Sequence, residues 1–124
     1  MIIKSEYDKI QTYVTKDGSL IRELIHPSRH GPNVAMSLAE AVVPLDGETT
    51  LHRHLTFQEI YHFLEGEGIM TLGEESFSVK VGDSVLIPAG TPHKVANTGT
   101  ASLRFLCCCT PPYTHEETEL LESS

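Results

Sequence analysis

Four residues in the middle of the chain have side chains of the kinds that hold a metal ion: His52, His54, Glu59 and His93. Imidazole nitrogens bind iron, nickel, copper and zinc well, and a carboxylate also suits manganese. Residues two apart on a strand point to the same face, so His52 and His54 would enter one cavity together. The set predicts one divalent metal ion per chain, which can be Mn, Fe, Ni, Co, Cu or Zn.

The short interval between His54 and Glu59 poses a geometric difficulty. Strict alternation along one strand would place Gln58, and not Glu59, on the face of His54. Glu59 reaches the ion only if residues 55–58 bend or bulge between two strands. From the residues alone, either Glu59 or Gln58 could be the ligand that joins the three histidines.

Short apolar segments separated by turn-forming residues recur along most of the chain, which is typical of an all-β protein. Pairs such as Asp17-Gly18 and Asp46-Gly47 have the chemistry of tight turns. Strands without crossover helices must close into a barrel or stack as a sandwich. Strands are predicted at residues 11–15, 20–26, 34–43, 59–65, 68–72, 76–79, 84–87, 93–96 and 103–110.

The two segments outside these strands carry different signals. Residues 27–32 contain two prolines and a glycine, which predicts an irregular loop across one end of the barrel. In the tail, Thr114-His115-Glu116-Glu117 is a capping-box pattern, and Leu120-Leu121 could dock one turn later. A short C-terminal helix is therefore predicted, with a frayed acidic tail as the alternative.

The composition bounds the class of protein. The chain has 124 residues, 40% of them hydrophobic and 21% charged, which predicts one globular domain. A formal charge of -8 argues against partners such as nucleic acid or an anionic membrane. The sequence contains neither an apolar run of about 18 residues nor the pattern of a signal peptide, so a cytoplasmic location is expected. The consecutive cysteines, residues 107–109, cannot all pair within one chain and are interpreted as reduced core residues.

Two segments resemble the two motifs of the cupin family. Residues 47–66 resemble the first motif, although the glycine at its start usually stands one place further from the first histidine, which alters only a loop length. Residues 82–97 resemble the second motif at each defining position, namely Gly82, Pro88, Gly90, His93 and Asn97. The resemblance implies a double-stranded β-helix, which is a small jelly-roll barrel.

The same resemblance implies that His52, His54, Glu59 and His93 bind one metal ion, and it favours Glu59 over Gln58. One cupin domain would then span residues 1–124, with a core barrel at about 34–110, N-terminal strands in 1–33 and an acidic tail in 111–124. Small cupins commonly pair, so a homodimer is expected, with the N-terminal strands offering edges that need to be covered.

The other candidate residues are assigned by strand parity. Tyr61, Phe63, Met70 and Phe105 are expected to fill the barrel, with Cys107 and Cys109 on the side of Phe105. The nearest candidate for proton transfer is Tyr61, or Glu59 acting as a labile ligand, and Tyr61 is the predicted catalytic residue. The residues expected away from the site are His26, His30, Arg53, His62, Arg104, Cys108 and His115.

Two functions follow from this site. The first is a small metal-dependent enzyme acting on a compact oxygen-rich metabolite, as a dioxygenase or as a sugar-type isomerase or lyase. No basic cluster marks a phosphate cradle, so a phosphorylated substrate is not expected. The alternative is a non-catalytic module that binds or senses a small ligand. A storage or structural barrel is disfavoured because the full ligand set is present.

Overall fold

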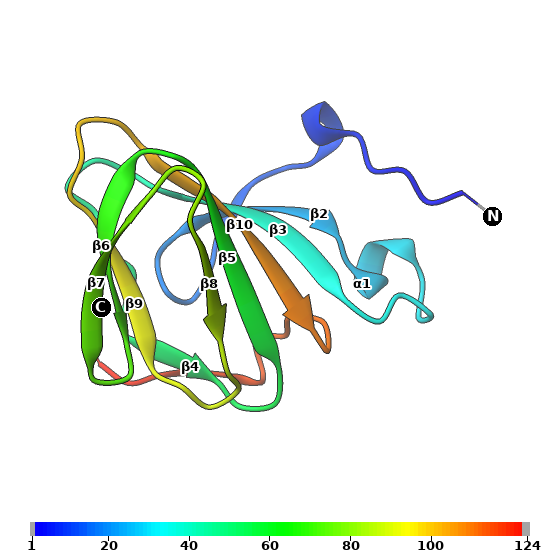
Figure 1. The fold of residues 1–124 in the computed structure, drawn as a ribbon. Coiled ribbons are helices and arrows are strands. Elements are labelled where there is room, and N and C mark those ends of the chain that lie inside the picture. Colours follow the sequence, from blue (N-terminus) through cyan, green and yellow to red (C-terminus); the bar gives the residue numbers. More distant parts are fainter. Residues whose placement is uncertain (1, 123–124) are drawn as a thin grey trace.

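The computed structural model describes residues 2–122 and consists almost entirely of β-strands (Figure 1). The elements in chain order are η1 (Tyr7–Lys9), β1 (Tyr13–Val14), β2 (Leu20–Ile25), α1 (Pro27–His30), β3 (Ser37–Val43), β4 (His52–His54), β5 (Gln58–Glu65), β6 (Glu67–Leu72), β7 (Glu75–Lys80), β8 (Ser84–Ile87), β9 (His93–Asn97), β10 (Leu103–Thr110) and β11 (Thr118–Leu120).

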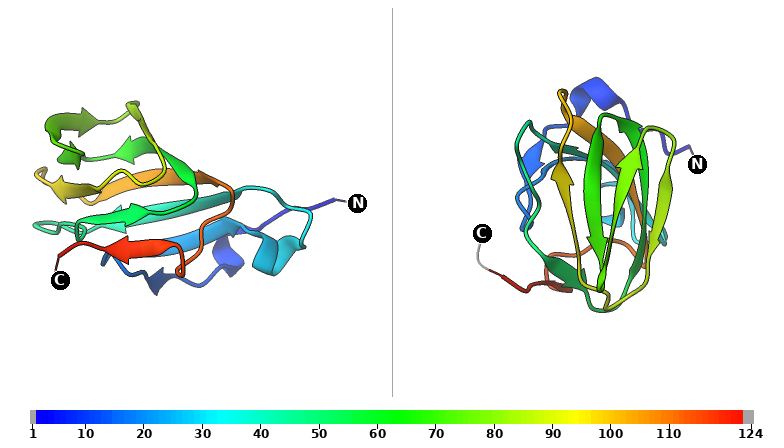
Figure 2. Two further views of the ribbon diagram at one scale, coloured as in Figure 1. Left: turned by 90° about the horizontal axis from the view of Figure 1, so that it is seen from below. Right: turned by 60° about the vertical axis from the view of Figure 1, so that its left-hand side comes forward.

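The strands form two antiparallel sheets that face each other and enclose the core (Figures 1 and 2). One sheet has the order β1-β2-β3-β10-β5-β8, and the other has the order β11-β4-β9-β6-β7. Several neighbours in these orders, such as β3 with β10 and β4 with β9, are far apart in the sequence, as expected for a jelly roll. The predicted all-β jelly-roll barrel is confirmed.

Alternation along the strands places apolar side chains between the sheets. On β10 the side chains of Leu103, Phe105, Cys107 and Cys109 are buried, and the residues between them are partly exposed. The Phe105 ring packs against those of Tyr61 and Phe63, with centroids 4.5 and 5.1 Å apart. Met70 is also fully buried. The predicted barrel filling and the parity of the cysteines are thus confirmed.

The geometry of two turns explains why the motifs have a glycine at Gly66 and an asparagine at Asn97. Gly66 joins β5 to β6 with a φ of 84°, and a Cβ placed there would lie 2.5 Å from the carbonyl oxygen of Ser102. The Asn97 side chain accepts a hydrogen bond from the Gly99 amide at 3.0 Å, which closes the turn after β9. Its amide group donates to the carbonyl of Val43 at 3.0 Å and so ties this turn to the facing sheet.

The predicted C-terminal helix is wrong. Thr114 does accept a hydrogen bond from the Glu117 amide at 3.2 Å, as in a capping box, but the helix does not continue beyond this turn. Residues 118–120 instead pair with β4 as strand β11, because that pairing buries Thr118 and satisfies the backbone of an edge strand. The last tail residues, 123–124, lie outside the described part.

Other boundaries differ in smaller ways. Within the predicted loop at 27–32, His26 caps a four-residue helix, α1, by accepting a hydrogen bond from the Ser28 amide. The first predicted strand shortens to the two residues of β1, and β4 is a strand that the apolar pattern did not reveal. Within residues 2–122, none of the helices has the length and apolar character required to cross a membrane.

Candidate metal centre

Two strands of the five-stranded sheet bring three histidines together. His52 and His93 are direct partners in the pairing of β4 with β9, and His54 lies two residues further along β4 on the same face. All three side chains are buried, with 0–4% of each residue exposed. One ring nitrogen from each lies within 4.8 Å of the other two, so the three could hold one metal ion.

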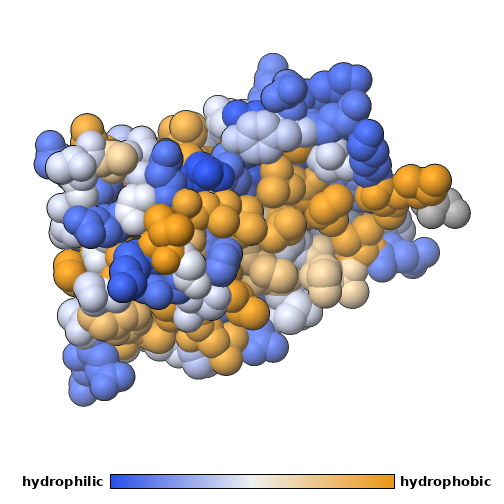
Figure 3. Space-filling model, turned by 45° about the horizontal axis from the view of Figure 1, so that its top comes forward, coloured by the Kyte–Doolittle hydropathy of each residue, from blue (hydrophilic) through white to orange (hydrophobic). Residues whose placement is uncertain are grey.

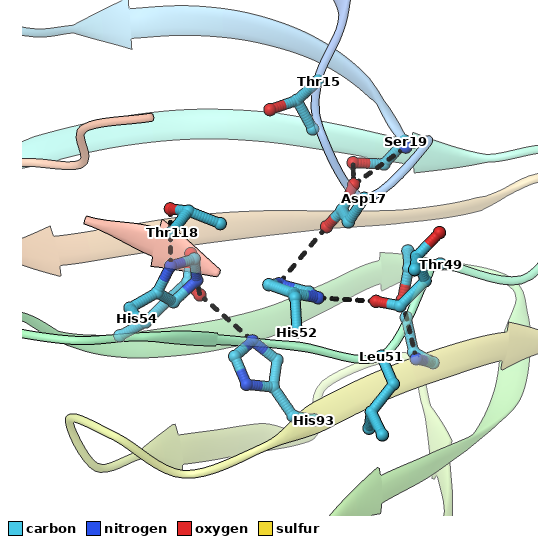
Figure 4. A network of polar contacts seen from close by, with 12 residues as sticks. Thr15, Asp17, Ser19, Thr49, Leu51, His52, His54, His93 and Thr118 are labelled. Carbon is cyan, nitrogen blue, oxygen red and sulfur yellow. Dashed lines mark hydrogen bonds and ion pairs between the residues drawn. The ribbon is translucent and has the colours of Figure 1, made fainter. Parts of the chain in front are cut away.

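The Nδ1 atom of each ring is held by a neighbouring acceptor, and Figure 4 shows the contact between His54 and Thr118. The Nδ1 atom of His52 bonds the carbonyl of Thr50 at 2.7 Å, and that of His93 bonds the carbonyl of Thr91 at 3.0 Å. A carbonyl can only accept, so in both rings Nδ1 carries the proton. In a neutral ring Nε2 is then left with its lone pair.

In His54 the acceptor that holds the proton on Nδ1 is a hydroxyl group. Its Nδ1 lies 3.0 Å from Oγ1 of Thr118, and that hydroxyl donates its own hydrogen to the carbonyl of Thr114 at 2.9 Å. The Thr118 oxygen therefore accepts from His54, which leaves Nε2 of His54 without a proton in the neutral ring. A backbone or side-chain acceptor on the outer nitrogen is the usual arrangement behind a metal-binding histidine.

Glu59 joins the cluster from the facing sheet. The chain crosses from β4 to β5 through a bend at residues 55–57, so parity does not carry over from His54. Oε1 of Glu59 lies 3.0 Å from Nε2 of His54 and 3.7 Å from Nε2 of His93. Gln58 is exposed on the opposite side of β5, which rules it out as the substitute ligand.

The electrostatics of the site fit a cation. Burial, followed by the charge of His93, lowers the pKa of His52 to about 4, so this ring is neutral at neutral pH. Burial alone would raise the pKa of Glu59, but the neighbouring rings of His54 and His93 hold it below its usual range. Nε2 of His93 is buried without a hydrogen-bond partner. Three imidazole rings and a carboxylate therefore converge, which is a donor set for a transition metal.

The cavity beside the histidines is small and mostly apolar. Its volume is about 40 Å³, and a single water molecule needs about 10–15 Å³. The Tyr61 ring lies 5.8 Å from that of His93, and burial, then the charge of Glu59, raises the pKa of its hydroxyl well above the usual value. The Cys109 thiol donates to Oε2 of Glu59 at 3.3 Å. This volume suits a compact ligand.

The remaining predicted residues are located away from the three histidines. Arg53 pairs with Glu119 at 2.9 Å, and His62 bonds Ser84 on the outer face of β5. Imidazole nitrogens of His26 and His115 contact Tyr113, at its carbonyl and its hydroxyl respectively. His30 bonds the backbone of His26.

Sequence reasoning missed Asp17, which reaches the site from the turn between β1 and β2. Its Oδ2 lies 3.5 Å from Nε2 of His52 (Figure 4). The pair Asp17-Gly18 signalled only a turn, and no local pattern links residue 17 to a histidine 35 positions later. Thr118 was missed for the same reason.

Comparisons with known proteins agree with this architecture. A family model described as a cupin domain matches residues 39–109. An uncharacterised protein of Methanocaldococcus jannaschii is 58% identical over 121 residues, which cover 98% of this chain and 96% of that protein.

Solved structures with the same fold come from enzymes and a predicted enzyme. The polyketide cyclase RemF of Streptomyces resistomycificus superposes with a TM-score of 0.80 and 21% identity over 100% of this chain and 88% of its own. A predicted oxalate decarboxylase of Thermotoga maritima gives a TM-score of 0.73 and 24% identity over 88% and 99%. The nucleoside dehydratase Pac13 of Streptomyces gives 0.76 and 11% over 98% and 92%.

Proposed function

Because the chain belongs to the cupin family, we propose that it is a metal-dependent enzyme that acts on a compact, oxygen-rich small molecule as a lyase or isomerase. The observation that carries the proposal is the convergence of ring nitrogens from three buried histidines, with the Glu59 carboxylate beside them. One divalent transition metal ion per chain would be held by His52, His54, His93 and Glu59. The ion would be one of Mn, Fe, Co, Ni, Cu and Zn.

The chemistry follows from this ligand set. Such an ion, when bound, supplies a Lewis acid that polarises a substrate oxygen or carboxylate. The chain's own groups would orient the substrate and exclude water, since Tyr61, Phe105 and Cys107 form apolar walls of the cavity. Tyr61 would donate a hydrogen bond or proton, because its raised pKa keeps the hydroxyl protonated.

The lyase or isomerase alternative is favoured over the dioxygenase. The three similar structures are named for cyclisation, decarboxylation and dehydration, and none of these overall reactions consumes oxygen. This support is an analogy of fold, because each of these structures is less than 25% identical to the chain. The small cavity supports a compact substrate.

The test is a turnover screen of metal-reconstituted protein against small hydroxy acids, keto acids and sugars, run with and without oxygen. We expect turnover that needs the metal and continues without oxygen, and that is lost in His93→Gln. Oxygen uptake coupled to turnover would assign the dioxygenase instead. Tight binding of one compound without turnover would assign the ligand-binding or sensing module.

A further inference from the structure

Asp17 holds one carboxylate oxygen in place and turns the other toward the histidines. Oδ1 accepts hydrogen bonds from the amide and the hydroxyl of Ser19, at 2.9 and 2.6 Å. Oδ2 faces Nε2 of His52 at 3.5 Å (Figure 4). Only 8% of Asp17 is exposed, so the carboxylate lies inside the protein.

The turn that carries Asp17 is tied to both sides of the site. The Thr50 amide donates to the carbonyl of Asp17 at 2.8 Å, and the carbonyl of the same Thr50 fixes the ring of His52. Lys16 donates to the carbonyls of His115 and Thr118 at 2.9 Å, which fastens the turn to the segment behind His54. Asp17 is therefore positioned by the residues that orient the histidines.

The contact between Asp17 and His52 is unfavourable without a cation. In the neutral ring of His52 the proton is on Nδ1, so Nε2 and Oδ2 then both present lone pairs. Two ligands at right angles on one ion, with bonds of about 2.1 Å, lie about 3.0 Å apart. The distance of 3.5 Å is comparable to the 3.7 Å between Nε2 of His93 and Oε1 of Glu59.

From this geometry we propose that Asp17 is a second carboxylate ligand of the metal ion, through Oδ2. The inference rests on the proposed metal centre and extends it to a residue outside the matched family segment, residues 39–109. Charge supports it, because two carboxylates with neutral imidazoles balance a divalent cation in a buried site, whereas Glu59 alone would leave a net positive charge. The ammonium group of Lys16 is already bound to carbonyls and points to the C-terminal segment.

Five protein ligands would limit how a substrate binds the metal ion. In a six-coordinate site they leave one position, so a substrate would bind the ion through a single oxygen. A chelating substrate would have to displace one carboxylate, and Asp17 sits on a turn rather than on a strand. The N-terminal hairpin would thereby restrict which substrates bind.

The experiment compares Asp17→Asn, Glu59→Gln and Glu23→Gln in the full chain. Glu23 is the matched control, because it lines the same cavity but makes no ion pair with the three histidines in residues 2–122. The probe is Co²⁺, whose affinity is measured by chelator competition and whose ligand number is read from its visible absorption spectrum. We expect Asp17→Asn to weaken Co²⁺ binding by about 10-fold or more and to change the spectrum, with Glu23→Gln within about 2-fold of wild type.

The possible outcomes separate this inference from the proposed function. If Asp17→Asn binds Co²⁺ like Glu23→Gln while Glu59→Gln binds weakly, Asp17 is no ligand and the metal centre stands. If the wild type binds no Co²⁺, the proposed function fails with it. Ser19→Ala loosens the turn but keeps the carboxylate, so affinity within about 3-fold of wild type would show that the Asp17→Asn effect is not a folding defect. A loss in Ser19→Ala equal to that in Asp17→Asn would contradict direct ligation.

Discussion

Each of the three buried histidines has one ring nitrogen engaged and one directed into the cavity. The acceptors are supplied by Thr50, Thr91 and Thr118. Two of these lie two residues from their histidine, whereas Thr118 lies 64 residues from His54. A wrong tautomer would turn a ligand atom into a proton donor, so these contacts matter as much as the ligands.

Thr118→Val tests this role of the outer acceptor. The substitution keeps the shape but removes the oxygen that accepts from Nδ1 of His54, so we expect metal affinity to fall by about 10- to 100-fold. Chelator competition measures the change. Thr71→Val is the control, because Thr71 bonds Ser76 at an exposed position and should leave affinity unaltered. Equal affinities in the two variants would contradict the tautomer argument.

Tyr61→Phe tests the proposed proton donor. The variant keeps the ring that packs against Phe105, so stability should change by less than about 1.5 kcal/mol and metal affinity should be unaltered. Turnover of the substrate found in the screen should fall by about 100-fold or more, since an acid or base contributes about 10²- to 10⁴-fold. Full activity in this variant would remove Tyr61 from the reaction and leave it a packing residue.

At the scale of the elements, the site depends on the crossing between the two sheets. His52, His54 and His93 come from one sheet and Glu59 from the other, and the bend at residues 55–57 allows Glu59 to face His54. The odd interval between His54 and Glu59 showed that Glu59 could be a ligand only if the chain bends here, and the resemblance to the cupin motif favoured Glu59. It could not predict β11, because a three-residue strand has too little apolar alternation to compete with a capping-box signal.

Much of the barrel could be predicted from its turns, because some turn positions have no room for a side chain and therefore require glycine. Gly66→Ala should destabilise the protein by about 2–4 kcal/mol, because the positive φ disfavours a side chain and the new Cβ would meet the carbonyl of Ser102. Gly82→Ala is the matched control, since Gly82 also has a positive φ but open space around it, and should cost about 1 kcal/mol. Urea unfolding measures both. An equal loss of unfolding free energy in the two variants would show that the contact with the carbonyl of Ser102 is relieved at no cost in stability.

At the scale of the whole molecule, an apolar row crosses the outer face of the six-stranded sheet. The pairing register aligns outward-facing side chains from five strands, namely Leu86, Ile60, Cys108, Leu38 and Ile25. Leu86 and Ile60 are 55% and 43% exposed. Figure 3 shows apolar side chains in a band across one face that continues to the N-terminal segment, where Ile2 and Ile3 are exposed. We propose that a second copy of the chain covers this row.

Ile60→Glu tests the homodimer. A charge in the row should convert a dimer into a monomer, seen by light scattering after gel filtration, while metal affinity is kept because Ile60 points away from the cavity. Val81→Glu, at another exposed apolar position, is the control and should stay dimeric. Removing residues 1–19 should likewise give monomers or aggregates. A wild type that is monomeric, or an unchanged elution volume after truncation, would contradict the proposal.

The central claim is that His52, His54, His93 and Glu59 hold one divalent metal ion. The most direct measurement is the metal content of reconstituted protein after extensive dialysis, for the wild type, His93→Gln and the outer-face control His62→Gln. We predict one equivalent of a first-row metal per chain in the wild type and in His62→Gln, and a large loss in His93→Gln. A wild type that retains none of the six metals, or a His93→Gln variant that retains a full equivalent, would contradict it.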